Sequence, residues 1–282
     1  MKKALLIGIN YVGTEHELRG CINDINNFYT MLTTYFNYDK NNIVCLTENL
    51  NSANHPNKQT IMDAINWLTL NQQDGDTLTL YYSGHGSNSP DTSADEKDGK
   101  DEVIVPLDFN QNGVITDDWL NDNLVDKIRP GVKFYSFFDS CNSGTVLDLK
   151  CNVECDTRPF LSFRDLKRLN GRYIPWFWSN NYKVSYDADT NTSRHRYCFS
   201  ACLNTELANE VHINSMQQGL FSYFFQDIVR KNLTENNMQR CTLKHKDIIK
   251  AVNANLMMNN FDHQNCMLSV CNVGDIDEFL SL

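Results

Sequence analysis

The stretches YYSGHG (Tyr81–Gly86) and FYSFFDSCNSG (Phe134–Gly144) are the most informative part of this sequence about the fold. Each is an apolar, aromatic run that gives way to small residues, which is typical of a buried strand ending in a loop. One strand end carries His85 and the other carries Cys141. Because active residues of an open α/β sheet gather where its parallel strands end, we expect these two side chains to lie together.

A cysteine and a histidine at neighbouring strand ends form the minimal unit of thiol catalysis. The imidazole takes the thiol proton, and the thiolate attacks a carbonyl carbon. Taken alone, Cys141 is explained as a small buried core residue and His85 as a turn residue. Taken together, with Gly84 and Gly86 beside the histidine and Gly144 behind the cysteine, they indicate a cysteine peptidase.

Composition limits the partners that the chain is expected to have. The 282 residues are enough for one substantial core, and no Pro/Ser/Gly linker divides them, so we expect a single domain. The formal net charge of -10 does not suit a nucleic-acid partner, because phosphate contacts need clustered Lys and Arg. The acidity indicates a cationic substrate or a bound metal ion, unless it serves solubility alone.

Ten cysteines raise the question of disulfides. They lack the dense spacing of a small secreted scaffold, and Cys45, Cys198 and Cys202 lie in apolar runs typical of core thiols. Cys151 and Cys155 are four positions apart in a polar segment and could pair or bind metal, although no second pair at zinc spacing accompanies them. We therefore expect a reducing, cytoplasmic compartment.

The first residues mimic a secretion signal. Met1-Lys2-Lys3 precedes an apolar run, but that run ends at Asn10 and is too short for a signal peptide. It is better interpreted as a first buried strand. Because no apolar segment approaches the length of a membrane span, we expect no membrane partner.

Alternating strand-like and helix-like segments indicate the fold class. The sequence predicts strands over residues 2–10, 43–46, 76–83, 133–139, 197–203 and 267–270, a hairpin at 103–107, and helices over 21–36, 58–70, 216–231 and 244–257. Thr116 is a candidate helix N-cap. The alternation predicts an α/β fold with a mostly parallel central β-sheet and helices on both faces. Residues 145–195 are predicted to be one long irregular loop.

The motifs at Ser83–Gly86 and Asp139–Gly144 resemble those of the metacaspases, caspase-like cysteine peptidases found outside animals. Further matching segments are Gly20–Asp24, Asp98–Glu102, Thr116–Asp118 and Asp148. The resemblance covers residues 1–149 well and 197–282 more loosely. It implies a caspase-like fold in which 1–149 is the large-subunit (p20) region, 150–196 a linker and 197–282 the small-subunit (p10) region. The layout resembles the type I metacaspases without an N-terminal prodomain.

The resemblance implies roles for the residues of the dyad. Cys141 is the expected nucleophile and His85 the expected general base. The backbone N–H groups of Gly86 and Cys141 are expected to hold the oxyanion. No Asn or Asp is clearly placed as a third catalytic member.

The resemblance also implies a pocket for the substrate side chain before the cleaved bond. Metacaspases take Arg or Lys there, and the pocket residues of the family match Cys21, Asp24, Ser83 and Asp139. Asp139 lies two residues before Cys141 on one strand, so both side chains are expected on the same side. The segment 199–210 departs from the family wording Gln-Thr-Ser-Ala-Asp, so no substrate contact is assigned there.

Calcium is the second ligand that the resemblance implies. The four family aspartates match Asp101, Asp117, Asp118 and Asp148, and carboxylate oxygens suit Ca²⁺. The plainer interpretation is solvated loop acids together with acids that favour a helix start at 117–118. A bound ion would link the Asp101 loop to the segment after Cys141 and explain calcium-dependent activation.

Two further expectations concern processing and alternatives. The linker 150–196 holds several Arg and Lys residues, so a peptidase that cuts after them is expected to cleave itself there, as a zymogen does.

The chain is expected to act as a monomer. The alternatives are a catalytically silent scaffold of the same fold, or another caspase-fold peptidase such as a legumain-like or separase-like enzyme.

Overall fold

The computed structural model describes most of the chain. The described residues are 1–49, 52–90, 100–141, 146–147, 149, 151–155, 182–186, 194–203, 206–213, 215–238, 240–261 and 263–282. Among them, no helix is both long and apolar enough to cross a membrane.

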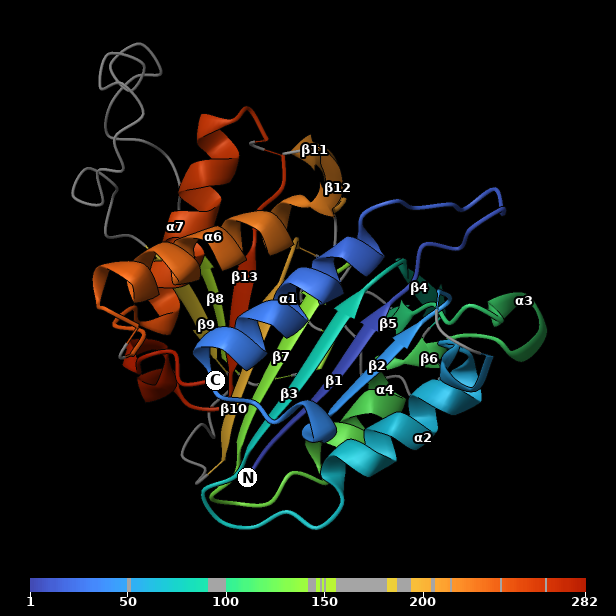
Figure 1. The fold of residues 1–282 in the computed structure, drawn as a ribbon, viewed down its shortest axis with the longest axis horizontal. Helices are drawn as coiled ribbons and strands as arrows, with labels where there is room; N and C mark the ends of the chain where they lie inside the picture. The colour runs from blue at the N-terminus through green and yellow to red at the C-terminus, as the bar shows by residue number, and fades with distance from the viewer. Residues whose placement is uncertain are drawn as a thin grey trace.

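An eight-stranded sheet forms the centre of the molecule, with strand order β2-β1-β3-β7-β10-β13-β8-β9 (Figure 1). The first five strands in this order pair in parallel: β2 (Ile43–Thr47), β1 (Lys2–Gly8), β3 (Thr77–Ser83), β7 (Lys133–Asp139) and β10 (His195–Ser200). The remaining pairs are antiparallel and add β13 (Met267–Val270), β8 (Cys151–Cys155) and β9 (Tyr182–Tyr186).

Helices cover both faces of this sheet because the central strands are apolar on both sides. One face packs against α1 (Cys21–Tyr35), α6 (Leu220–Glu235) and α7 (His245–Met258), through strand residues that include Leu6, Tyr81 and Phe137. The other face packs against α2 (Lys58–Thr69), α4 (Asp117–Leu120) and the π-helical turn Asn121–Val125, through Leu80 and Phe138 among others. The predicted α/β class, with a mostly parallel central sheet and helices on both faces, is therefore confirmed.

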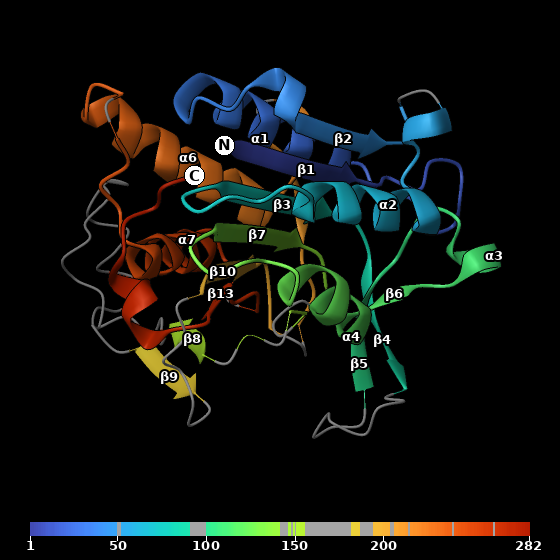
Figure 2. The same ribbon diagram turned by 90° about the horizontal axis from the view of Figure 1, so that it is seen from below.

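Two smaller β elements lie beside the main sheet. The strands β4 (Gly86–Pro90), β5 (Lys100–Ile104) and β6 (Ile115–Thr116) form an antiparallel sheet that stands away from the central one (Figure 2). A short α-helix, α3 (Phe109–Asn112), precedes β6. The strands β11 (Glu210–Ile213) and β12 (Met216–Gly219) form a separate hairpin.

Most predicted elements are observed within a few residues of their predicted ends, but two predictions were wrong. Residues 216–219 form strand β12, and the helix predicted over 216–231 begins only at Leu220. The segment predicted as one irregular loop contributes β8 and β9 to the main sheet. Cys151, placed by the sequence in a polar segment, is consequently buried in the core.

The nine cysteines whose side chains the structure describes are free thiols. Cys198 and Cys202 are buried, as expected for core residues, and Cys45 is half-buried. The predicted N-cap at Thr116 is present, because its hydroxyl accepts a hydrogen bond from the Trp119 N–H at 3.2 Å. Most of the predicted linker 150–196 lies outside the described residues.

Candidate active site

His85 and Cys141 stand at the same end of two neighbouring strands. In the parallel pair β3–β7, Ser83 lies opposite Asp139. The Gly84 N–H donates to the Asp139 carbonyl oxygen at 3.3 Å, which extends the pairing one step further. His85 and Cys141 are each two residues beyond this matched position, so the register places both at one level.

Gly86 fits closely against the nucleophile. A Cβ atom on Gly86 would overlap the carbonyl oxygen of Cys141 and lie 3.2 Å from the Ser140 hydroxyl oxygen. Only a residue without a side chain allows this approach of the two backbones. The close approach is compatible with the predicted role of the Gly86 and Cys141 N–H groups toward an oxyanion, which stays a prediction.

The ring of His85 is oriented by a backbone carbonyl. Its Nε2 lies 2.7 Å from the His16 carbonyl oxygen. A carbonyl can only accept a hydrogen bond, so Nε2 carries the proton, and Nδ1 of the neutral ring is left as the proton acceptor. The carbonyl of His16 thus orients the His85 ring. The sequence offered no Asn or Asp side chain that was clearly placed for this role.

Two tyrosines hold the loop that carries His85. The Tyr11 hydroxyl accepts a hydrogen bond from the His85 backbone N–H at 3.1 Å and donates to the Val105 carbonyl oxygen at 2.6 Å. The ring of Tyr11 also lies against the imidazole, with 4.7 Å between centroids. The Tyr82 hydroxyl donates to the His85 carbonyl oxygen at 2.7 Å. The backbone of Tyr11 has a φ of 51°, an unusual conformation for this residue type and one found preferentially at functional sites.

The thiol of Cys141 is half-buried and accepts a hydrogen bond from the Ala208 N–H at 3.4 Å. Burial raises the pKa of this thiol, and repulsion from Asp139 acts in the same direction. No hydrogen bond joins the thiol to the His85 ring, both of which belong to the described part of the chain. The thiol is therefore protonated at rest and needs a base to become a nucleophile.

Asp24 lies buried beside the dyad, where helix α1 and hairpin β11–β12 meet. Its carboxylate accepts hydrogen bonds from the Ser83 hydroxyl at 3.0 Å and from the Gly219 N–H at 3.0 and 3.2 Å. Burial, followed by repulsion from Asp139, raises the pKa of Asp24 well above its usual range. The structure thus joins two of the predicted pocket residues, Asp24 and Ser83, by a direct hydrogen bond.

Asp139 is the second buried carboxylate of this region. It accepts hydrogen bonds from the backbone N–H and the hydroxyl of Ser222, at the start of α6. Burial raises the pKa of Asp139 to about 6, with a further contribution from Glu210. A Cβ on Gly219 would overlap the Asp139 carboxylate, so this glycine allows the hairpin to close over both acids.

Glu210 is a third acid of this region and was missed by the sequence analysis. Its carboxylate accepts hydrogen bonds from the Gly20 N–H at 2.7 Å and the Arg19 N–H at 3.1 Å, and the Cys21 thiol lies 3.8 Å from it. It therefore links strand β11 to the start of α1 and places a third carboxyl group near Asp24. The sequence could have indicated this role, because Glu210 is the acid that ends the segment 199–210. That segment departs from the motif of the family.

The predicted calcium ligands lie on a different part of the fold. Asp101 is buried in β5, and Asp117 and Asp118 form the first turn of α4. Asp117 accepts hydrogen bonds from the Glu102 and Asp118 N–H groups at 2.7 and 2.8 Å, and burial raises its pKa. Asp148 lies outside the described residues.

Carboxylate oxygens are the donors that Ca²⁺ prefers, so the residues fit the ion in their chemistry. Among the residues that the structure describes, however, the one compact group of three metal-binding side chains lies elsewhere in the fold. The calcium site stays a prediction.

Comparison with known proteins decides the family. The sequence model of the metacaspase peptidase C14 domain matches residues 2–150, more than half of the chain and both strand ends described above. The chain belongs to the metacaspase family. The resemblance inferred from the motifs is thereby confirmed, and with it the caspase-like fold.

Curated relatives agree with this assignment. Metacaspase-1A of Aspergillus fumigatus is 48% identical over 149 residues, covering 52% of this chain and 36% of that protein. Metacaspase-1 of Saccharomyces cerevisiae is 46% identical over 149 residues, covering 52% of this chain and 34% of its own length. The match therefore spans only about a third of each relative.

A solved structure supports the fold of the complete chain. A Geobacter sulfurreducens protein superposes with a TM-score of 0.62 and 20% identity, covering 99% of this chain and 98% of that one. At this identity the likeness concerns architecture alone. It includes the C-terminal half, which the family model does not match.

Proposed function

We propose that this metacaspase-family chain is a cysteine endopeptidase that cleaves proteins after Arg or Lys. The observation that carries the proposal is the position of two buried carboxylates, Asp24 and Asp139, beside the strand ends that hold His85 and Cys141. Buried acids without a cation are costly, and a substrate guanidinium or ammonium group would relieve that cost. A third acid, Glu210, favours the same choice of substrate.

The hydrolysis would proceed as follows. Nδ1 of His85 takes the Cys141 proton, and the thiolate attacks the carbonyl carbon of the residue before the cleaved bond. The C–N bond breaks as the imidazolium returns its proton to the departing amine, which leaves a thioester. Water, deprotonated by His85, then hydrolyses the thioester and restores the thiol. The His16 carbonyl keeps Nε2 protonated throughout, so the same nitrogen of His85 serves both proton transfers.

Calcium activation and self-cleavage belong to the same proposal. Asp101, Asp117, Asp118 and Asp148 would hold the ion, which would supply positive charge that orders the rim of the site. Cleavage within 150–196 would produce a larger and a smaller piece that stay associated, because β7 from the first part pairs with β10 from the second. We further propose that the chain works as a monomer in a reducing, cytoplasmic compartment.

Substitution of the nucleophile tests the proposed chemistry. Cys141→Ala should abolish hydrolysis of a fluorogenic Arg peptide in the presence of calcium while preserving the thermal unfolding curve. Cys45→Ala, which removes a half-buried thiol on β2, is the matched control and should retain activity. Substantial hydrolysis by Cys141→Ala would refute the assignment, and an inactive wild-type chain that is folded and calcium-loaded would favour the silent scaffold.

Intact-mass analysis tests self-cleavage. Wild type incubated with calcium should yield two fragments from a cut within 150–196, and Cys141→Ala should stay whole. The same fragments from both chains would point to a contaminating protease and would contradict self-processing.

A further inference from the structure

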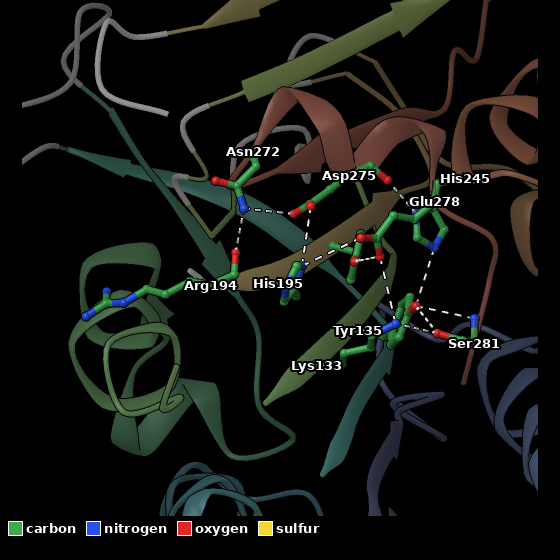
Figure 3. A network of polar contacts seen from close by, with 10 residues as sticks. Lys133, Tyr135, Arg194, His195, His245, Asn272, Asp275, Glu278 and Ser281 are labelled. Carbon is green, nitrogen blue, oxygen red and sulfur yellow. Dashed lines mark hydrogen bonds and ion pairs between the residues drawn. The ribbon is translucent and has the colours of Figure 1, made fainter. Parts of the chain in front are cut away.

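A second cluster of polar side chains lies at the opposite end of the sheet from the dyad. His195 is the first residue of β10, and Asp275 lies in the 3-10 turn Val273–Asp277, with Glu278 directly after it. Their ligand atoms (one ring nitrogen and two carboxylate oxygens) all lie within 4.8 Å of one another. Figure 3 shows dashed lines from His195 to both carboxylates. The proposed peptidase chemistry uses none of these residues.

The distances within the cluster are longer than those of a close, charge-assisted hydrogen bond. His195 Nδ1 lies 3.4 Å from Asp275 Oδ1 and 3.9 Å from Glu278 Oε1. A charge-assisted N–H···O bond would bring the atoms to about 2.7–2.9 Å. The Nδ1 atom is buried and has no hydrogen-bond partner, although two carboxylates face it. The two contacts are loose ion-pair distances rather than close hydrogen bonds.

The same distances suit ligands gathered around one ion. Around a tetrahedral cation with bonds of about 2.0–2.1 Å, neighbouring ligand atoms are about 3.3–3.4 Å apart. The His195–Asp275 separation already matches this spacing. All three ligand atoms lie within 4.8 Å of one another, so Glu278 would move inward to complete three corners. The fourth corner would be left for water or another ligand.

Neighbouring groups orient both carboxylates toward His195. The Tyr197 hydroxyl donates to Glu278 Oε2 at 2.6 Å, and the Asn272 side chain donates to Asp275 Oδ2 at 3.1 Å. One carboxylate oxygen of each acid thus accepts a hydrogen bond from a neighbouring side chain. The other oxygen of each acid is the one that contacts His195. Such outer partners are typical of metal sites, where they fix the direction of the ligands.

Other charged or titratable groups that face the cluster include Lys133, His245, Tyr135, Cys151 and Cys271. Lys133 Nζ lies 3.8 Å from Glu278 Oε2 and offsets part of its charge. His245 is buried, and its Nδ1 donates to the Asp275 backbone carbonyl oxygen at 2.9 Å. Lys133 and His245 thus contact Glu278 Oε2 and the Asp275 backbone, whereas the contacts of His195 are with Asp275 Oδ1 and Glu278 Oε1.

We propose that His195, Asp275 and Glu278 form a binding site for a divalent transition-metal ion of the Zn²⁺ type. An imidazole nitrogen with two carboxylates suits such an ion better than Ca²⁺, which takes oxygen ligands. The site would clamp the beginning of β10 to the C-terminal turn. It is separate from the predicted calcium aspartates and does not depend on the proposed peptidase activity.

Calorimetric titration with Zn²⁺ alone tests this site. The parent should be the full chain carrying Cys141→Ala, so that neither self-cleavage nor the catalytic thiol interferes. One ion per chain should bind, and His195→Gln should weaken the affinity by more than about tenfold. His212→Gln removes an exposed histidine on β11 and should leave the affinity unchanged.

Two further measurements keep the test decisive if His195→Gln folds poorly. Tyr197→Phe removes only the hydroxyl that orients Glu278 and should weaken binding about 10–100-fold. Co²⁺ loaded in place of Zn²⁺ should give visible bands without the thiolate charge-transfer band that cysteine ligands produce. Absence of binding to the parent, equal affinity in parent and His195→Gln, or a thiolate band would each overturn the proposal.

Discussion

The hydroxyl of Tyr11 connects the His85 loop to Val105, directly after β5, so it holds the proposed general base in position. Tyr11→Phe deletes this connection and keeps the ring that lies against the imidazole. We expect kcat for an Arg peptide to fall about fivefold, since one buried hydrogen bond contributes about 1 kcal/mol. The matched control is Tyr38→Phe, which deletes another buried hydroxyl that bonds to Thr79. Equal activity losses in both variants would contradict a positioning role for Tyr11.

Asp139 is a buried acid of the proposed pocket, and its burial lowers the stability of the folded state at neutral pH. Its folded-state pKa of about 6 lies above the value of an unfolded chain, so the native state binds more protons between about pH 4 and 6. The contribution of this group to stability is thus full at low pH and is lost as the pH rises through about 6. Asp139→Asn should therefore stabilise the chain at pH 7.5 by about 2 kcal/mol and remove part of the pH dependence.

Chemical denaturation at pH 5 and 7.5 measures this effect. The same variant should lose cleavage after Arg, because the neutral amide no longer attracts a cation. An Asp139→Asn chain that is less stable than wild type at pH 7.5, or equally active, would show that the carboxylate is structural.

Glu210 is predicted to add charge and to hold the start of α1. Glu210→Gln keeps one acceptor oxygen for the Gly20 N–H but removes the charge. We expect kcat/KM for Arg peptides to fall about tenfold, mainly through KM, because the change weakens binding of the cation. Glu206→Gln is the control, since Glu206 also accepts backbone N–H bonds, from Leu203 and Asn265, outside the pocket. A loss confined to kcat, or shared by the control, would refute this role.

Among the elements, the β11–β12 hairpin covers the two acids of the proposed pocket. Asn23 donates to the Gln217 carbonyl oxygen at 2.9 Å, and Asn27 donates to the Gln218 side chain at 3.0 Å, so α1 and the hairpin are joined at several points. The hairpin approaches Asp139 through Gly219, where no side chain fits.

Gly219→Ala should therefore displace the hairpin from both acids. We expect kcat/KM for Arg peptides to fall at least about a hundredfold, because the pocket and the dyad share the same strands. Gly274→Ala is the matched control, as a Cβ there would meet no atom within 4 Å. Wild-type kinetics in Gly219→Ala would show that the hairpin does not form the pocket.

The elements that sequence analysis missed have a common physical cause. Strands β8 and β9 interrupt a polar segment. β8 is stabilised by pairing with β13 and β9, and β9 by pairing with β8, rather than by an apolar run of its own. Strand β12 precedes α6 directly, so its residues extend a helical pattern until Gly219. Local periodicity cannot show such pairings, which depend on residues far apart in the chain.

For the whole molecule, the first half was predictable and the second half much less so. Strands β1, β3 and β7 are apolar runs with clear ends, and their parallel order follows from the alternation with helices. The His16 carbonyl could not be predicted, because a backbone group leaves no trace in residue type. The role of Glu210 depends on the fold of the C-terminal half, where the family motifs are weak.

We propose that the thiol of Cys141 cleaves bonds after a cationic residue held by Asp24 and Asp139. The most direct measurement compares kcat/KM for two fluorogenic peptides that differ only by Arg or its neutral isostere citrulline before the cleaved bond, with calcium present. We predict that the Arg peptide is cleaved at least about a hundredfold faster, since an unpaired buried charge costs several kcal/mol. Cleavage of both peptides at similar rates, or cleavage that persists in Cys141→Ala, would contradict the account.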